Sequence, residues 1–479
     1  MVVKKSRFRF LINAFLCTAV FFTSLQAVSA LLRDKGGSTL PSYQQEPVHQ
    51  EDVLFLGSSH IYFNVNPAVL WEEQGIAAWN AAASYQPVWT SLRYLQEVCA
   101  VHKPQVAVVD VFGAVLWKDD FEENQARMQN GYRQNVQFLR NPAVWAGSIQ
   151  DAVPREDRLS YYFDLISYHN RLPELSQRDF EAPQLLPGRR LVKGYLPYGR
   201  VVPFSGDVSP LPQEGQPGLS PKNEKAIREL ASYCQSEGIS LLLLNTPYVP
   251  DSYTSLCSVS DQAAALRGIR TLALELDIPF LDYTQPEEGF SPDWKLETGD
   301  GGQHLNTRGA HRFSQLLGQK LRTLYSLPDR RKDSDFFSWE KAGSDYRKLA
   351  ENETLALQTD ASCWISSLPE RCLVLLAWDS PPQAGSPAAC LAESLGLTAL
   401  EESGVAVVNK GDVLFQGQEY FSYHLEGHRV HLTPDRILLD GEEAAPKGEG
   451  MKAVVFDAEL DMTVDGVILS NNEFIPVFR

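Results

Sequence analysis

Short apolar runs alternate with amphipathic segments along residues 52–326. Apolar runs bounded by turn residues are typical of strands buried on both faces of a parallel sheet. They occur at 52–56, 76–80, 106–112, 240–245 and 278–282. Between and after them, apolar positions recur at helical spacing at 67–73, 88–102, 221–237, 263–276 and 309–325. The alternation predicts an α/β fold with helices on both faces of a parallel sheet, over residues 52–328.

Two segments interrupt this pattern. Residues 113–218 break the alternation, and we interpret them as a long, partly helical insertion that covers or walls a site, since long insertions are often functional. Charged residues from Asp329 to Asp335 predict a linker at 329–345. Beyond it, short β-like runs at 373–378, 405–408, 436–439 and 454–456, with one helix near 391–395, predict a small β-rich domain over 346–479.

The N-terminus combines a basic cluster with an apolar run at 10–32, about the length needed to cross a bilayer as a helix. We expect residues 1–35 to be a single-pass anchor with a cytoplasmic N-terminus, followed by a polar stalk at 36–51. A cleavable signal peptide ending at Val28-Ser29-Ala30 is the competing interpretation, and a buried core helix is a third. The apolar run continues to Leu32, which favours the anchor. Either of the first two alternatives places the remainder outside the cytoplasm, at the cell membrane or secreted.

Composition narrows the possible partners. The formal net charge of -17 excludes electrostatic capture of nucleic acid, and 44% hydrophobic residues are ordinary for globular domains. The seven cysteines show no metal-ligand spacing, so we expect no metal site and no cofactor. Cys363 could pair with Cys372 or Cys390 in an exported protein, and buried free thiols are an equal alternative.

Candidate chemistry lies at two places in the α/β pattern. Gly57-Ser58-Ser59-His60 follows the first strand, and Asp300 and His304 follow the fifth. A serine hydroxyl needs a base to take its proton, and the base needs an acid to orient it. We therefore predict Ser59 as nucleophile, His304 as base and Asp300 as its orienting acid. Each element also has a structural interpretation, because a Gly-Ser-Ser turn is common and Asp300 could cap a turn.

A developing oxyanion would need donors, and we expect the backbone N–H groups of Ser59, Ala83 and Ser84 to supply them. Supporting roles are predicted for five further residues near these segments: Gly57, His60, Asn80, Gln86 and Asp110. His60 is expected to support because adjacent side chains on an extended turn point apart. Asp110, which ends the third strand, is expected to fix a loop.

These residues resemble the SGNH (GDSL-like) hydrolase superfamily over about residues 52–326. Gly57-Ser58-Ser59-His60 resembles its first block, and Asp300 to His304 with Leu305-Asn306 resembles its last. The resemblance implies a flavodoxin-like three-layer α/β/α domain and Ser-His-Asp ester chemistry. The chain departs from the family where Asp300 precedes His304 by four residues instead of three. It also has Asp110-Val111-Phe112-Gly113 where a Gly-x-Asn-Asp block is usual, which removes one oxyanion donor.

Those departures are similar to the membrane-anchored branch of bacterial cell envelopes, which includes the D-alanyl-lipoteichoic acid transfer protein and the alginate O-acetylation proteins. Tyr168-His169-Asn170-Arg171, Asp179-Phe180 and Lys193-Gly194-Tyr195 also resemble a signature of that branch. Residues 370–479 resemble the interleukin-like EMT inducer (ILEI/PANDER) domain, through Arg436 to Gly441, Gly448 to Asp457 and Asp465 to Ser470. That resemblance implies a compact β-rich fold with a carbohydrate-binding role.

Together these features predict a membrane-anchored, extracytoplasmic esterase or O-acyltransferase of the SGNH type. Its expected partners are a glycan or acylated envelope polymer, the membrane through the N-terminal helix, and a membrane acyl-donor protein, but no nucleic acid. The absent third block keeps a second alternative open, a catalytically weak glycan-binding or scaffolding protein. A secreted signalling protein is a third alternative, suggested only by the C-terminal resemblance.

Overall fold

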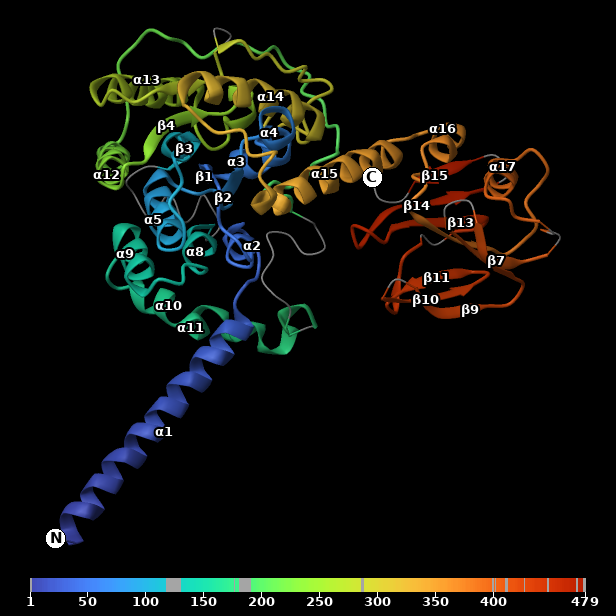
Figure 1. The fold of residues 1–479 in the computed structure, drawn as a ribbon, viewed down its shortest axis with the longest axis horizontal. Coiled ribbons are helices and arrows are strands. Elements are labelled where there is room, and N and C mark those ends of the chain that lie inside the picture. The colour runs from blue at the N-terminus through green and yellow to red at the C-terminus, as the bar shows by residue number, and fades with distance from the viewer. Residues whose placement is uncertain are drawn as a thin grey trace. The chain divides into compact units, whose positions relative to one another are not determined.

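The computed structural model describes residues 2–117, 131–175, 177–180, 191–285, 288–398, 400, 402–409, 412–425, 427–445, 448–470 and 473–476. The chain divides into two compact units, Met1–Glu340 and Lys341–Arg479 (Figure 1). The first unit contains the serine, histidine and aspartate singled out in the sequence. The second contains most of the antiparallel strands.

The first unit is built on a five-stranded sheet in the order β2-β1-β3-β4-β5, with every described pair parallel. Its strands are β1 (Val53–Gly57), β2 (Ala78–Ala82), β3 (Val106–Asp110), β4 (Ser240–Asn245) and β5 (Phe280–Asp282). This is the flavodoxin-like order, so the predicted α/β class is confirmed. The order also brings the carboxyl ends of β1 and β3 side by side, where the Ser59 turn and Asp110 lie.

The principal helices of the first unit are α4 (Pro67–Gln74), α5 (Val88–Cys99), α12 (Pro221–Glu237), α13 (Val259–Glu275) and α14 (Thr307–Leu324). Helix α5 packs with α12, and α4 packs with α14. Alternate strand residues such as Leu54, Leu56 and Val109 share one apolar cluster with buried side chains of α5, α12 and α13. Burial of these apolar side chains away from water is the main contribution to the stability of such a core.

Residues 36–51 differ from the polar stalk expected there. Helix α2 (Leu40–Tyr43) buries Leu40 and Tyr43, and Ser38 forms an isolated bridge with Ala83. The Thr39 hydroxyl donates to the Asn80 carbonyl oxygen at 2.6 Å. Apolar side chains within a mostly polar segment therefore hold it against β2.

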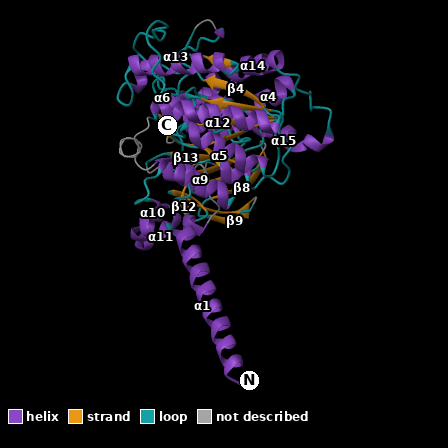
Figure 2. Ribbon diagram, turned by 90° about the vertical axis from the view of Figure 1, so that its left-hand side faces the viewer, coloured by secondary structure: helices purple, strands orange, loops and turns teal. Residues whose placement is uncertain are grey.

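Helix α1 (Val2–Leu32) precedes this segment as one continuous helix. Its Phe10–Leu32 part is long and apolar enough to cross a bilayer, and its side chains are largely exposed. Figure 2 shows α1 as one long helix. That exposure argues against the core-helix alternative, because a core helix would be buried. An anchor and a signal sequence share the observed properties.

Between β3 and α12, short helices replace the strand–helix alternation. They are α6 (Phe112–Leu116), α8 (Gly131–Val136), α9 (Pro142–Ala152), α10 (Arg158–Tyr162), α11 (Asp164–Tyr168), η1 (His169–Glu174) and η2 (Gln177–Phe180). Residues 118–130, 176 and 181–190 of the predicted insertion lie outside the described residues. Within the described part of the insertion, the Val202 N–H donates to the Thr298 carbonyl oxygen, and the Val202 carbonyl oxygen accepts the Gly301 N–H. This segment therefore contacts the loop that carries Asp300.

The predicted linker at 329–345 contains η5 (Ser334–Phe336) and the first half of α15 (Phe337–Ala356). Phe336 and Trp339 are buried, and Trp339 donates its indole N–H to the Ala78 carbonyl at 3.1 Å. Arg330 also pairs with Asp52 at 2.8 Å. These aromatic and ionic contacts hold residues 330–339 within the first unit.

The second unit is β-rich, as predicted, and contains two antiparallel sheets, ordered β15-β14-β13-β6-β7-β8 and β12-β11-β10-β9. The strands are β6 (Leu373–Trp378), β7 (Gly404–Asn409), β8 (Asp412–Gly417), β9 (Phe421–Leu425), β10 (His428–Thr433), β11 (Arg436–Leu439), β12 (Glu442–Glu443), β13 (Met451–Asp457), β14 (Met462–Leu469) and β15 (Phe474–Pro476). Alternate β6 residues enter two apolar clusters, one shared with α16 (Ala361–Ser366) and α17 (Pro387–Ser394), the other with β10 and β11. All seven cysteines are free, which favours the thiol alternative over a disulfide.

Candidate active site

Ser59 lies where β1 passes into a short helix. Gly57 ends the strand with φ +149°, and a Cβ there would lie 2.4 Å from Asp110 Cβ, so a side chain is excluded. Ser58 caps α3 (Ser59–Asn64), and its Oγ accepts the His60 N–H at 3.3 Å. Ser59 is therefore the first residue of a helix, whereas the sequence interpretation placed it in an extended turn.

The structure brings Ser59, His304 and Asp300 together in one hydrogen-bonded chain. Ser59 Oγ lies 2.8 Å from His304 Nε2. On the other side of the ring, His304 Nδ1 lies 2.6 Å from Asp300 Oδ2. The other Asp300 oxygen accepts the His304 main-chain N–H at 2.8 Å. The carboxylate thus fixes both the backbone and the ring of the histidine, and leaves Nε2 to face the hydroxyl.

The four-residue spacing between Asp300 and His304 is accommodated by two glycines. Gly301 and Gly302 adopt φ values of +76° and +95°, which fold the loop back on itself. A Cβ on Gly302 would also lie 2.7 Å from a Val249 methyl group. Asn64 Oδ1 accepts the Leu305 N–H at 2.9 Å, which ties the loop to α3. The helix that begins at Ser59 thereby positions the histidine loop as well.

Two of the three predicted oxyanion donors are wrong. The Ala83 N–H donates to the Gly57 carbonyl at 3.0 Å, because the pairing of β1 with β2 continues past the strand ends. The Ser84 N–H donates to the Gly37 carbonyl at 2.8 Å, in the segment predicted to be a stalk. Only the Ser59 N–H of the predicted set has no acceptor among the described residues.

Tyr62 is a site residue that the sequence interpretation missed. Its hydroxyl lies 3.0 Å from Ser84 Oγ, and the Ser59 side chain is near enough to act on its pKa. Burial raises the pKa of Tyr62 to about 12, so the phenol stays protonated and can donate. The signal was present in the spacing, since residues three apart lie on the same face of a helix.

Asp110 supports the serine turn from β3. Its Oδ2 accepts from Ser58 Oγ at 2.8 Å and from the Ser58 N–H at 3.3 Å, and its Oδ1 accepts the Phe112 N–H at 3.2 Å. Burial raises the pKa of Asp110 to about 6. Its contacts are those of a residue that holds the turn, as predicted for the end of the third strand.

His60 lies beneath the reacting groups. Its Nδ1 is 3.0 Å from Thr246 Oγ1, its Nε2 is 2.9 Å from the Tyr253 hydroxyl, and its ring stacks on Phe112 at 3.9 Å. Burial lowers the pKa of His60 well below its ordinary value. Both ring nitrogens are occupied and the ring centroid lies 5.0 Å from that of His304. Its contacts thus suit support by packing, with no nitrogen left for proton transfer.

The remaining supporting residues differ in their relation to the triad. Asn80 Nδ2 donates to the Val65 carbonyl at 2.7 Å, which holds the end of α3. Gln86 is not brought to the triad, and its amide donates to Ser91 Oγ on α5 at 3.0 Å. Gly194 fits against Asn80, where a Cβ would lie 2.2 Å from the Asn80 carbonyl oxygen. The Lys193-Gly194-Tyr195 motif is therefore packed close to the support of α3.

Aromatic side chains border the triad. Phe63 stacks on Tyr198 with ring centroids 4.8 Å apart, and its ring lies 4.9 Å from that of His304. Tyr85 is 43% exposed and adopts φ +53°, an uncommon conformation for a tyrosine and one that is frequent at functional sites. Flat apolar faces are thus available beside the reacting groups.

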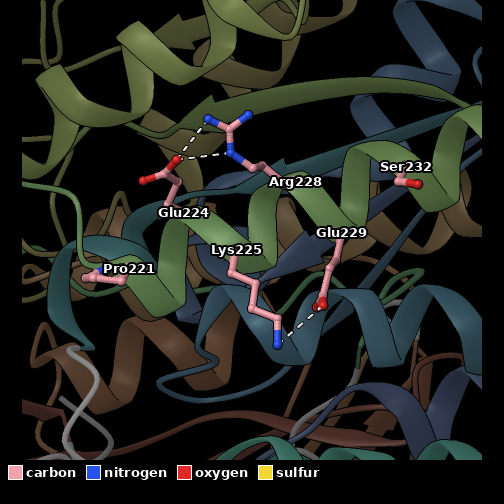
Figure 3. Close-up of a pocket in the computed structure, with 6 residues that line it drawn as sticks. All are labelled: Pro221, Glu224, Lys225, Arg228, Glu229 and Ser232. Atoms are coloured by element: carbon pink, nitrogen blue, oxygen red, sulfur yellow. Dashed lines mark hydrogen bonds and ion pairs between the residues drawn. The ribbon is translucent and has the colours of Figure 1, made fainter.

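A shallow depression on α12 shares no residue with this site (Figure 3). It is lined by Pro221, Glu224, Lys225, Arg228, Glu229 and Ser232. The charged side chains pair with one another, Glu224 with Arg228 and Lys225 with Glu229, in the i,i+4 pattern of an exposed helix face. The depression thus shows the pairing of a solvated helix surface. Among the described residues, no group of three or more His, Cys, Asp or Glu side chains could hold a metal ion.

No protein-family model matches the chain, and no curated protein matches it. Among solved structures, the chain is similar to a GDSL-like lipase from Bacteroides thetaiotaomicron, at 14% identity and a TM-score of 0.30, over 60% of this chain and 96% of that one. It is also similar to the lipase/acylhydrolase from Enterococcus faecalis, at 11% identity and a TM-score of 0.30, over 59% and 100% of the two chains. AlinE4, an SGNH-hydrolase family esterase, matches at 11% identity and a TM-score of 0.23, over 59% and 99%. With TM-scores in this range, the likeness assigns neither a family nor an activity.

Proposed function

We propose that the first unit is a serine esterase or O-acyltransferase of the SGNH type. The observation that carries the proposal is the contact of Ser59 Oγ with His304 Nε2 at 2.8 Å, with Asp300 bound to the opposite ring nitrogen. A nucleophile, a base and an orienting acid in hydrogen-bond reach are the parts that acyl transfer requires. The order of the parallel strands places the serine turn at the carboxyl edge of the sheet, where α/β folds bind ligands.

In the proposed reaction, Ser59 Oγ attacks the carbonyl carbon of an ester while His304 Nε2 takes the hydroxyl proton. The tetrahedral intermediate collapses when the ester C–O bond breaks and His304 returns that proton to the leaving alcohol. The acyl group is then bound to Ser59 through an ester bond. Water or a sugar hydroxyl attacks this second ester while His304 takes the proton of the incoming group. The bond between the acyl carbon and Ser59 Oγ then breaks, and His304 returns the proton to Ser59 Oγ.

The oxyanion would be stabilised by the Ser59 N–H and the Tyr62 hydroxyl. The first has no acceptor among the described residues, and the second belongs to a residue of the same helix that lies near the serine side chain. A buried phenol that stays protonated can donate a hydrogen bond to a developing oxyanion. This pair replaces the asparagine of the usual third block, and it also replaces the backbone donors predicted at Ala83 and Ser84.

We further propose that the substrate is an acylated glycan outside the cytoplasm, at the membrane in which α1 is anchored. The support is the apolar helix, the aromatic faces of Phe63 and Tyr198 beside the triad, and the resemblance of 370–479 to the ILEI/PANDER domain. Sugar rings stack on such aromatic faces through their apolar C–H groups. A membrane protein that supplies acyl groups is the proposed partner if the enzyme transfers and does not hydrolyse.

The test compares wild type with Ser59→Ala on 4-nitrophenyl acetate and on an O-acetylated polysaccharide, with and without a free sugar acceptor. Ser236→Ala, an exposed serine on α12, is the matched control. We expect a loss on the order of 10³-fold or more in Ser59→Ala and none in the control. Acetate release alone would indicate hydrolysis, and an acetylated acceptor would indicate transfer. Equal activity of Ser59→Ala and wild type on both esters would overturn the proposal.

A glycan-binding scaffold is the second candidate. It is favoured by the absence of the usual third block and by the occupied N–H groups of Ala83 and Ser84. A scaffold predicts that Ser59→Ala retains polysaccharide binding and that wild type has no turnover to lose. Turnover that depends on Ser59 would exclude it as the sole function.

A further inference from the structure

We propose that the short helices beside the C-terminal end of α1 lie on the membrane surface and insert apolar side chains into it. We call this group of helices the collar. The collar consists of α10, α11, η1 and η2, residues 158–175 and 177–180. It contains the Tyr168-His169-Asn170-Arg171 and Asp179-Phe180 motifs, which the proposed reaction does not use. The inference rests on the anchoring role proposed for α1.

Polar contacts join the collar to the last residues of α1. Arg33 Nε lies 2.8 Å from Asp164 Oδ2 on α11. Arg171 Nη1 donates to the Leu32 carbonyl, and its Nη2 binds Asp179 Oδ1 at 2.6 Å. Figures 1 and 2 both show α10 and α11 beside the C-terminal end of α1. The Arg33–Asp164 pair and the hydrogen bond from Arg171 to the Leu32 carbonyl therefore fix the collar to the point where the apolar helix ends, and the Arg171–Asp179 pair orients Arg171.

The length of α1 sets the depth of that point. The Phe10–Leu32 span has 23 residues, which at 1.5 Å per residue is about 34 Å, close to the roughly 30 Å thickness of the hydrocarbon core. When that span crosses a bilayer, Leu32 lies at one interface and Arg33 just outside the hydrocarbon. The groups bonded to Leu32 and Arg33 must then lie at the same level as the lipid headgroups.

At this level the collar exposes large apolar side chains. Phe180 is 73% exposed, Leu159 58%, Leu172 54% and Ile166 48%. Isolated exposed apolar residues are ordinary, but four on neighbouring short helices beside a membrane span are suited to interfacial insertion. Arg171 pairs with Asp179 and Asp164 pairs with Arg33, so these charges are engaged within the protein and apolar contact would hold the lipid.

The experiment uses the full chain in phosphatidylcholine nanodiscs, with an environment-sensitive nitrobenzoxadiazole probe on single cysteines. Cys17, Cys363 and Cys390, the exposed thiols, are replaced by serine. Probes are placed by Leu172→Cys and Phe180→Cys in the collar, and by Val208→Cys as a control on a described loop that is 45% exposed. A parallel sample retains Cys17 in the apolar run to report the insertion of α1. Quenching by lipids that carry a nitroxide on the acyl chain is measured for each.

We expect at least about twofold quenching at Leu172 and Phe180, because interfacial apolar groups lie roughly 5–10 Å into the headgroup and acyl boundary. Val208 should stay unquenched. Quenching at Cys17 without quenching in the collar would overturn the collar and leave the anchor intact. No quenching at any position would overturn both. A blue shift in the collar without quenching would show a protein, such as a second copy, on this surface and would also overturn the proposal. None of these outcomes depends on ester turnover at Ser59.

Discussion

The two units each hold a histidine against aspartate, and the two arrangements have opposite chemical consequences. In the first unit, His304 meets one carboxylate through Nδ1 and presents Nε2 to a serine hydroxyl. In the second, His428 Nδ1 lies 2.6 Å from Asp440 and its Nε2 lies 2.6 Å from Asp461. Both sites pair a histidine with aspartate, but only the site in the first unit leaves a histidine ring nitrogen for proton transfer.

The difference shows what makes a histidine a base. The hydrogen bonds that His428 donates to Asp440 and to Asp461 raise the pKa of His428, so its charged form is favoured and no lone pair faces a substrate. Both carboxylates stand on residues with positive φ, Asp440 at +54° and Asp461 at +56°, at turns of the β-rich unit. His428 thus holds turns together, whereas the placement of His304 suits it to move a proton.

The largest effect is expected from removing the imidazole ring of His304. His304→Ala should lower kcat/KM for an acetyl ester by on the order of 10⁴-fold or more, because Ser59 loses the group that takes its proton. His428→Ala is the matched control and should leave the rate unchanged. Steady-state rates with 4-nitrophenyl acetate measure both variants. A similar loss in both would mean that the effect is one of folding and not of the base.

Removing the charge of the Asp300 carboxylate is expected to have the next largest effect. Asp300→Asn keeps the side-chain shape but lets His304 adopt the wrong tautomer, so kcat should fall by roughly 10³- to 10⁴-fold. Asp440→Asn makes the same change beside His428 and should not alter kcat. Rates for both variants, with circular dichroism to verify folding, provide the comparison. Unchanged turnover in Asp300→Asn would remove the orienting role from this residue.

A smaller loss is expected from the missed tyrosine. Tyr62→Phe removes one oxyanion donor and should lower kcat by about 10²- to 10³-fold with little change in KM. Tyr94→Phe is the control. Tyr94 is also buried, and its hydroxyl donates to the Asn135 carbonyl at 2.8 Å. It lies on α5, a helix that carries no triad residue. If both variants lose only stability and neither loses kcat, Tyr62 is structural.

The smallest effect concerns the second histidine. The pKa of His428 is raised above 6.5 in the folded protein. Its ion pairs therefore stabilise the fold fully below about pH 6.5, the value for an unfolded chain. This stabilisation is lost as the pH rises through the pKa of the folded protein. Asp440 and Asp461 are largely exposed, so we expect less than about 1 kcal/mol. Hydrogen exchange of peptides spanning 428–440, at pH 5 and pH 9, should show this difference in wild type. A pH difference of the same size in His428→Gln would assign it to other groups.

The elements with strong end signals could be predicted from sequence. Helix α12 occupies the predicted range 221–237, since its ends carry local signals, a serine cap at Ser220 and a left-handed glycine at Gly238. The continuous apolar runs likewise predicted β1, β3 and β4. Helix α3 was missed because it is a single short helix with no charged residue in its first turn. That omission also concealed the alignment of Tyr62 with Ser59.

The triad and the oxyanion donors differ in how far sequence could predict them. Ser59, His304 and Asp300 follow strand ends of one parallel sheet, and that topology brings them together. The N–H groups of Ala83 and Ser84 depend on partners at Gly57 and Gly37, which are long-range contacts that no local pattern encodes. Likewise, the positive φ values of Gly301 and Gly302, which no local pattern specifies, reconcile the four-residue spacing with an intact Asp–His pair.

The central claim is that Ser59 is activated by His304, and active-site labelling tests it most directly. The full chain is treated with a fluorophosphonate, and the modified residue and its stoichiometry are read by peptide mass spectrometry. We predict one label per chain at Ser59, lost in His304→Ala and retained in His428→Ala. No label on Ser59, or equal labelling of Ser59 in wild type and His304→Ala, would contradict the account.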